Sequence, residues 1–206
     1  MPDEIEAKVK IADADAFRRR MAARGLADEG TVLEINRLFD TPAGSLGAAG
    51  SALRLREERD PADGRVLRTT LTFKGAVVAS AVKRRPEVEL AVEAAGPMAD
   101  VLGRLGLVPA FYYEKRRTTW HVGPCAVVLD EVPHLGWFAE VEGPTEAEVL
   151  AVLAHVDPGG EPTIRKSYRG LLAAYLTSRG MDPTRAEFQE RQTQGRSDAG
   201  NGQRQA

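Results

Sequence analysis

The chain has 206 residues, of which 43% are hydrophobic and 28% charged, which is the balance of a soluble globular domain with a core of its own. Its 28 basic and 30 acidic side chains leave a net charge of -2, so bulk charge gives no support to a nucleic-acid or anionic-membrane partner. The single cysteine, Cys125, excludes an internal disulfide and a thiolate metal cage. With no signal peptide and no membrane-spanning apolar stretch, we expect a cytoplasmic protein.

The chain begins with a strand pattern in which charged and apolar residues alternate. Residues 4–11 read E-I-E-A-K-V-K-I. Side chains two apart on a strand share a face, so Glu4, Glu6 and Lys8 would lie together with the apolar residues opposite. Residues 13–25 then predict a helix, with an aspartate cap at its start and Gly25 at its end.

Seven further segments predict strands, and turns rich in glycine and proline separate several of them. They are residues 32–39, 51–58, 66–74, 84–92, 114–121, 126–132 and 139–142. Further helices are predicted over 97–107, 145–156 and 167–179. Residues 1–180 form the one predicted domain, and the almost apolar-free residues 185–206 predict a disordered tail.

Many short strands with few helices predict an α+β fold. We expect a closed eight-stranded antiparallel β-barrel with helices packed outside it. Closure removes exposed sheet edges, and a barrel of this size can leave an interior for one small ligand.

The alternation of charged and apolar residues recurs on most of the later strands. Partners two apart are Arg54 and Arg56, Thr72 and Lys74, Arg85, Glu87 and Glu89, Lys115 and Arg117, Val128 and Asp130, and Glu140 and Glu142. A half-solvated sheet gives such alternation too. We favour a charged barrel interior, because the helices must cover the apolar faces and because the charged faces contain few of the serines, threonines and glutamines that solvated strands mix in.

A charged interior has a chemical consequence. Each unpaired ion in a dry barrel would cost several kcal/mol, so water, metal ions and a highly charged ligand must occupy it. Basic side chains would bind a polyanion, and carboxylates would bind a hard divalent cation such as Mg²⁺ or Mn²⁺. An oligophosphate with its metal requires both. No G-x-x-x-x-G-K loop occurs, so side chains must bind the phosphates.

In their order along the chain these motifs resemble the CYTH family, also called triphosphate tunnel metalloenzymes. Its members include class IV adenylate cyclases, thiamine triphosphatases and inorganic triphosphatases. The resemblance runs from residue 4 to about residue 175. It rests on E-x-E-x-K at 4–8, residues 36–42, 53–56 and 71–75, R-x-E-x-E at 85–89, K-x-R at 115–117, residues 129–132, G-x-F-x-E-x-E at 136–142, and residues 165–168.

The resemblance implies a triphosphate tunnel fold and a role for each charged group. Metal ions, Mg²⁺ or Mn²⁺, would be held by Glu4, Glu6, Glu140 and Glu142, with Asp130 as a further ligand or just behind them. The phosphates would contact Lys8, Arg54, Arg56, Lys74, Lys115, Arg117 and Lys166. A catalytic group would consist of Arg85, Glu87 and Glu89, in which the glutamates orient the arginine or position water.

The function that follows is metal-dependent hydrolysis of an inorganic or organic triphosphate: tripolyphosphate, thiamine triphosphate or a nucleotide. A class IV adenylate cyclase, which makes cyclic AMP and pyrophosphate from ATP, is the alternative. A non-catalytic polyphosphate or nucleotide binder is a third reading, and the acidic positions argue against it because binding needs mainly the basic residues. The expected partner is a small-molecule triphosphate, with neither nucleic acid nor membrane, and a homodimer is left open.

Three details stay open in the sequence. A one-residue bulge would turn Arg116 inward in place of Lys115 and Arg117. Lys166 reads equally as a surface charge and as a phosphate contact. Trp120 and Trp137 could stack on a nucleobase, although core or rim positions are commoner for tryptophan.

Overall fold

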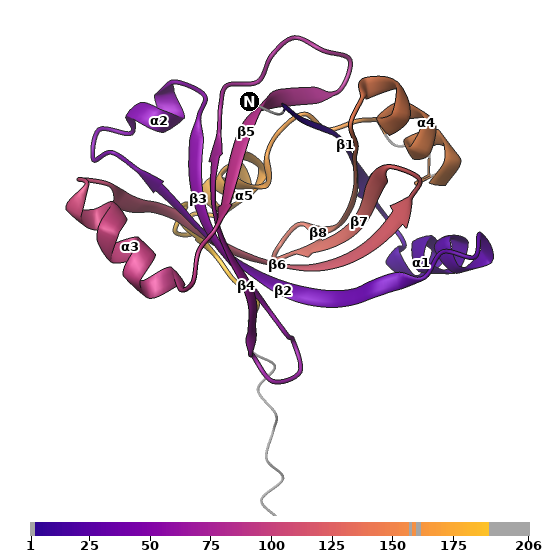
Figure 1. The fold of residues 1–206 in the computed structure, drawn as a ribbon, viewed down its shortest axis with the longest axis horizontal. Helices are drawn as coiled ribbons and strands as arrows, with labels where there is room; N and C mark the ends of the chain where they lie inside the picture. Colours follow the sequence, from indigo (N-terminus) through magenta and orange to yellow (C-terminus); the bar gives the residue numbers. More distant parts are fainter. Residues whose placement is uncertain (1–2, 157, 160–161, 190–206) are drawn as a thin grey trace, which may run out of the picture.

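The alternating segments of the sequence pair into one closed sheet. The structure is a computed structural model that describes residues 3–156, 158–159 and 162–189. The barrel strands are β1 (Asp3–Ile11), β2 (Asp28–Asp40), β3 (Ala52–Arg59), β4 (Val66–Lys74), β5 (Lys83–Ala91), β6 (Val108–Val122), β7 (Cys125–Val132) and β8 (Gly136–Glu142). Their order is β2-β3-β4-β5-β1-β8-β7-β6, and antiparallel pairing of β6 with β2 closes the ring (Figure 1). The predicted α+β barrel with eight antiparallel strands is confirmed.

Within the described residues, five helices lie outside the barrel wall. They are α1 (Ala14–Ala23), α2 (Ser45–Ala48), α3 (Ala95–Arg104), α4 (Glu146–Val156) and α5 (Tyr168–Ser178). The predicted aspartate cap of α1 forms, because Asp13 accepts from the Ala16 backbone N–H, and Ser167 caps α5 by accepting from the Gly170 N–H. In the part of the chain that the structure describes, no helix has the length and hydrophobicity to cross a membrane.

The apolar faces of β1, β7 and β8 turn outward and pack against α1 and α4. Ile5, Ala7 and Val9 of β1 are buried in one cluster with Phe17 of α1 and Val149 of α4. Burial of each such side chain contributes roughly 1.5–3 kcal/mol, so the hydrophobic core surrounds the barrel wall and leaves the interior to polar groups.

One end of the barrel is different, because apolar side chains there point inward. Leu38, Tyr113 and Phe138 pack against Tyr168 and Leu172 of α5. Helix α5 therefore packs against this end of the barrel (Figure 1).

The end of the described chain returns to the barrel. Residues Arg185–Ala186 form β9, which pairs in parallel with β6, and the Phe188 N–H donates to the Glu114 carboxylate at 3.0 Å. The chain is thus held by backbone and side-chain hydrogen bonds at residues 185–188, where the sequence predicted a disordered tail. The remainder of that predicted tail, residues 190–206, lies outside the described residues.

Gly143, directly after β8, is required for packing. A Cβ built there would lie 2.5 Å from Cys125 Sγ and 3.2 Å from Val149 Cγ2, and both of these side chains are fully buried. We therefore expect Gly143→Ala to lower the free energy of unfolding by about 1–3 kcal/mol, measured by urea denaturation. The control is Gly103→Ala in α3, where a Cβ would meet nothing within 4 Å. Equal effects of the two substitutions would contradict the steric explanation.

Candidate active site

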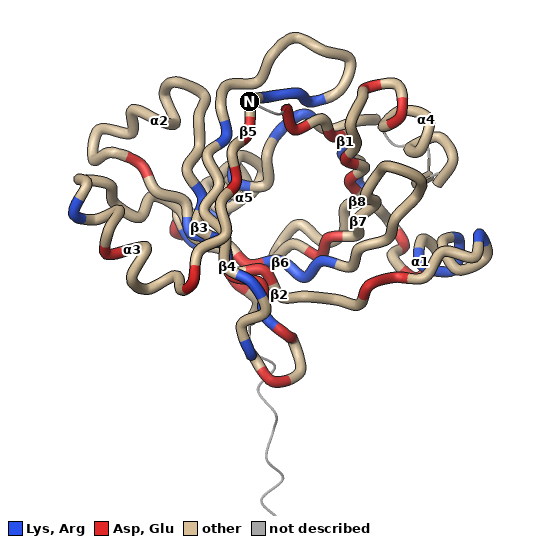
Figure 2. The backbone as a smooth tube through the Cα atoms, in the orientation of Figure 1, with Lys and Arg blue, Asp and Glu red and all other residues tan. Residues whose placement is uncertain are grey.

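The barrel encloses a cavity of about 600 Å³ to which all eight barrel strands contribute side chains. Figure 2 shows basic and acidic positions interspersed along the strands that form the ring. The basic side chains that line the cavity are Lys8, Arg54, Arg56, Arg68, Lys74, Lys83, Arg85, Lys115, Arg117 and Arg169. The acidic ones are Glu4, Glu6, Glu29, Glu34, Glu58, Glu87, Glu89, Glu140 and Glu142. The charged strand faces therefore turn into the barrel and not into bulk solvent.

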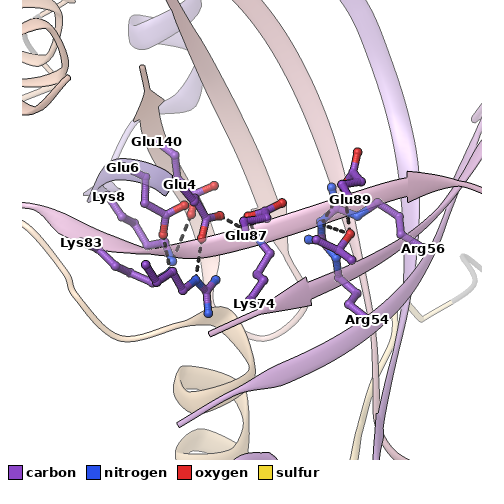
Figure 3. A network of polar contacts seen from close by, with 12 residues as sticks. Glu4, Glu6, Lys8, Arg54, Arg56, Lys74, Lys83, Glu87, Glu89 and Glu140 are labelled. Atoms are coloured by element: carbon purple, nitrogen blue, oxygen red, sulfur yellow. Dashed lines mark hydrogen bonds and ion pairs between the residues drawn. The ribbon is translucent and has the colours of Figure 1, made fainter. Parts of the chain in front are cut away.

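Glu4 lies at the centre of one group of ion pairs (Figure 3). It contacts Lys74 Nζ, and its Oε2 accepts from Arg85 Nε at 2.5 Å, while Glu87 lies 2.7 Å from the same Lys74 ammonium. Burial opposes ionisation of Glu4, but Lys74 and Arg85 outweigh it and hold the pKa of Glu4 well below its usual value. Glu4 is therefore a carboxylate throughout the physiological range.

Glu6 and Lys8 face strand β8 across a regular antiparallel pairing. Lys8 lies opposite Glu140, with 3.0 Å between Nζ and Oε1, whereas Glu6 lies opposite another carboxylate, Glu142. Like charges placed opposite each other destabilise a sheet. Glu142 is exposed at the barrel mouth, and partial burial and the nearby charge of Glu4 raise its pKa. Negative charge thus concentrates where β1 and β8 meet.

A second group of ion pairs surrounds Glu34, a residue that was not among the predicted site residues. This carboxylate is 1% exposed and lies 2.8 Å from Arg56, 3.2 Å from Lys115 and 3.4 Å from Arg117. Burial opposes the charge of Glu34, but these three cations keep its pKa well below the usual value. Glu34 is therefore positioned to hold three phosphate-binding candidates in place.

Asp130 lies behind the cavity wall. It is fully buried and accepts hydrogen bonds from Lys115 at 3.0 Å, from Arg117 at 2.6 and 2.7 Å, and from the Tyr168 hydroxyl at 2.9 Å. It is not among the side chains that line the cavity. The sequence left open whether Asp130 is a direct metal ligand or lies just behind the ligands. These contacts favour a position behind them.

The pairing of β6 shows which of its basic side chains face the cavity. β6 pairs without a bulge with β2 over residues 114–118 and with β7 over residues 116–122, and Lys115 and Arg117 line the cavity. Arg116 lies on the outer face, where it pairs with Glu131 at 2.8 Å. The bulge considered from the sequence does not occur.

Other predicted residues divide between the cavity and the surface. Arg54 lines the cavity and contacts Thr72 at 3.2 Å and Glu89 at 3.6 Å. The Lys166 side chain is exposed and does not line the cavity; instead, its carbonyl oxygen accepts from Lys8 at 3.3 Å. Its backbone, and not its ammonium, is thus what reaches the site.

Neither tryptophan reaches the cavity. Trp120 is 2% exposed and packs edge-on against Phe17, with 6.0 Å between ring centroids. Trp137 is half-buried beneath the Arg18 guanidinium at 4.8 Å. Both lie in the core or at its rim, so neither is placed to stack on a base in the barrel.

Lys83 and Arg169 line the cavity but were also missed. Lys83 precedes the predicted strand by one residue, yet it has the same parity as Arg85, so a longer strand would have included it. Arg169, in the first turn of α5, lies near Gly47, where a Cβ would be 3.3 Å from its guanidinium. No strand pattern could indicate Arg169, because α5 brings it to the barrel.

The acidic side chains that line the cavity have the chemistry of a hard-cation site. Glu4, Glu6, Glu140 and Glu142 offer only carboxylate oxygens, which Mg²⁺ and Mn²⁺ prefer. Within residues 3–156, 158–159 and 162–189, however, no three acidic, histidine or cysteine side chains are grouped closely enough to hold a metal ion. The carboxylate oxygens fit Mg²⁺ or Mn²⁺. To form a metal site, carboxylates that now pair with lysine and arginine must change partners.

Lys115 gives the site a pH dependence. Its ammonium is 1% exposed, and burial together with the neighbouring Arg117 lowers its pKa to about 8. Below that pH Lys115 is positive and attracts phosphate, and above it the attraction is lost. We expect the metal-free affinity for tripolyphosphate, measured by calorimetry, to fall as pH rises through about 8. Lys115→Met should remove this transition, and its persistence in that variant would contradict the assignment.

Comparison with known proteins agrees with this geometry. A family model described as the CYTH domain matches residues 2–153. An Aeromonas hydrophila protein named adenylate cyclase CyaB is 29% identical over 155 residues, which cover 71% of this chain and 72% of that protein.

Solved structures share the fold. The PH1819 protein from Pyrococcus horikoshii OT3 has a TM-score of 0.69 at 24% identity, covering 84% of this chain and 99% of that one. HpAC1 from Hippeastrum, for which a dominant triphosphatase activity is described, has a TM-score of 0.62 at 21% identity, covering 87% and 97%. The family model matches most of the sequence, and the closed barrel with its charged interior agrees with that match. The chain therefore belongs to the CYTH domain family.

Proposed function

We propose that this protein is a metal-dependent enzyme that hydrolyses a small-molecule triphosphate inside the barrel. The observation that carries the proposal is the lining of the cavity, where basic and acidic side chains from seven of the eight barrel strands converge in about 600 Å³. A lining of one sign would suffice for an ion of opposite charge. Both signs together suit a polyanion that carries a divalent cation.

The basic side chains supply the phosphate site. Arg54, Arg56 and Arg117 present planar guanidinium groups, which can bind phosphate oxygens in pairs, and Lys8 and Lys115 add ammonium donors. The carboxylate partners of Lys8, Arg56, Lys115 and Arg117 are buried, so these four donors are oriented before any ligand arrives. Preorganised positive charge of this kind stabilises the negative charge that shifts between phosphate oxygens during transfer.

The acidic side chains have two roles in this proposal. Glu4, Glu6, Glu140 and Glu142 would hold Mg²⁺ or Mn²⁺, which when bound supplies a Lewis acid for a phosphoryl oxygen and lowers the pKa of coordinated water. Glu87 and Glu89 contact Lys74 and Arg54 and would keep these cations aimed at the substrate. Arg85 contacts Glu4 and would be free to contact the substrate when a metal ion takes that carboxylate.

A second candidate is adenylate cyclase activity, favoured by the 29% identity to adenylate cyclase CyaB. The same basic lining would then bind the triphosphate of ATP. The reaction differs in its nucleophile, because the ribose 3′-hydroxyl must reach the α-phosphate and pyrophosphate must leave.

The test is product analysis on the purified full chain with Mg²⁺ or Mn²⁺ and, separately, tripolyphosphate, thiamine triphosphate and ATP. Orthophosphate release supports the hydrolase. Cyclic AMP with an equal amount of pyrophosphate supports the cyclase instead. Tight binding with no turnover of any substrate would overturn the enzyme proposal and leave a binding protein.

A further inference from the structure

Lys83 occupies an unusual position next to the candidate metal ligands. It starts β5 directly opposite Glu6 in the β1–β5 pairing, and its Nζ lies 2.5 Å from Glu6 Oε1. Both residues are buried, at 5% and 6% exposure. Lys83 belongs to none of the motifs on which the family resemblance rests, so its role has to be inferred from its contacts.

Glu6 lies between charges of opposite sign. Lys83 is its cross-strand neighbour on β5, and Glu142 is its cross-strand neighbour on β8. A divalent cation drawn to Glu6 and Glu142 would therefore compete with the Lys83 ammonium for the same carboxylate.

Two nearby carboxylates have the same kind of partner. Glu4 is paired with Lys74 and Arg85, and Glu140 with Lys8 and Arg117. Each of these cations also lines the cavity. The released lysines and arginines would thus remain beside an incoming polyanion, and an exchange of partners leaves every charge neutralised.

We infer that Lys83 is a positioning residue that neutralises Glu6 in the free protein and transfers to the substrate phosphates when a divalent cation takes Glu6. The inference rests on the proposed function. Its consequence is positive coupling, because each ligand releases the side chains that the other needs. The metal alone has to displace Lys83 without a new partner for the ammonium, so it binds weakly until the triphosphate is present.

A fixed structural salt bridge is the competing explanation. In that case Lys83 would stay on Glu6 in every state, and its removal would leave the coupling between metal and triphosphate unchanged. The two explanations therefore differ in a binding measurement that does not depend on catalysis.

The experiment is calorimetric titration of the full chain with Mn²⁺ alone, with tripolyphosphate alone, and with Mn²⁺ after saturation with tripolyphosphate. Lys83→Met should bind Mn²⁺ alone about tenfold or more tightly than the wild type, because the competing charge is gone. In the presence of tripolyphosphate the difference in Mn²⁺ affinity between Lys83→Met and the wild type should shrink to about twofold, because the wild-type lysine has then moved from Glu6 to the phosphates. Lys83→Arg keeps the charge and should retain the weak Mn²⁺ binding of the wild type.

The matched control is Arg84→Met, on the next residue. Arg84 pairs with Asp3 at 2.6 Å, is 47% exposed, and does not line the cavity. Its removal subtracts one positive charge from the same strand and should change Mn²⁺ affinity by no more than about twofold, as for a screened surface charge. Lys83→Gln, which keeps a polar group, serves if the methionine variant does not fold.

The outcomes separate the two proposals. If the wild type binds Mn²⁺ and tripolyphosphate but Lys83→Met gains no more than Arg84→Met, or keeps its gain with tripolyphosphate present, only the exchange is overturned. If the wild type binds neither ligand, the proposed function fails and the exchange fails with it.

Discussion

Glu6→Gln is expected to lower kcat for triphosphate hydrolysis by about 100-fold or more, because metal-ion catalysis contributes several kcal/mol and the amide is a poorer ligand for a hard cation. The substitution keeps the shape of a side chain that is 6% exposed. It also leaves Lys83 without its carboxylate. The measurement is steady-state kinetics with Mn²⁺, together with a thermal melt to show that the variant is folded.

The control for this prediction is Asp3→Asn, on the same strand. Asp3 pairs with Arg84 and does not line the cavity, so turnover should stay at the wild-type level. Full activity of a folded Glu6→Gln variant would remove Glu6 from the metal-binding residues.

Asp130→Asn should have the largest effect on stability. Its carboxylate is fully buried and accepts from Lys115, Arg117 and Tyr168, so the neutral amide leaves two buried cations short of a partner. Breaking a buried pair of this kind costs about 3–5 kcal/mol in the free energy of unfolding. Urea denaturation measures the loss, and the affinity for tripolyphosphate should fall as well because Lys115 and Arg117 are no longer held.

Two variants calibrate the Asp130 result. Tyr168→Phe removes one neutral donor and should cost only about 1 kcal/mol. Glu131→Gln alters the neighbouring residue, whose partner Arg116 is 43% exposed, and should be nearly neutral. If Asp130→Asn were as mild as Glu131→Gln, the network behind the cavity wall would not be holding the basic side chains.

The barrel could be predicted because period-two alternation specifies both the strands and their faces. Over residues 4–11 of β1 the even positions carry charge and the odd positions are apolar, and the same rule placed Arg54, Arg56 and Glu140 on the inner face. Charged faces that point into the barrel and charged faces that point into solvent give the same alternation. The two were distinguished by the need to bury the apolar faces against helices and by the scarcity of serine, threonine and glutamine on the charged faces.

The partners of each charge could not be predicted, because they depend on the register between strands. Asp130 and Lys115 are 15 residues apart and meet only through the β6–β7 pairing. Glu34 was missed for the same reason, since its three cations come from two other strands. Lys166 was predicted from its neighbours in sequence, but the start of α5 turns its side chain to the surface.

The short helix α2 could not be predicted from sequence patterns either. The Asp40 carboxylate accepts backbone N–H groups of Thr41, Leu46 and Gly47 at 2.7–2.9 Å, and these bonds organise the turn. A helix of this length has no periodicity to detect, because one side chain at the end of β2 organises it.

The most direct test of the charged interior as a triphosphate site is a crystal structure with Mn²⁺ and the non-hydrolysable imido analogue of tripolyphosphate. We expect the anion inside the barrel against Arg54, Arg56 and Arg117, with Mn²⁺ on carboxylates of β1 and β8. An interior that excludes the anion, with the ligand bound only on the outer surface, would contradict the account.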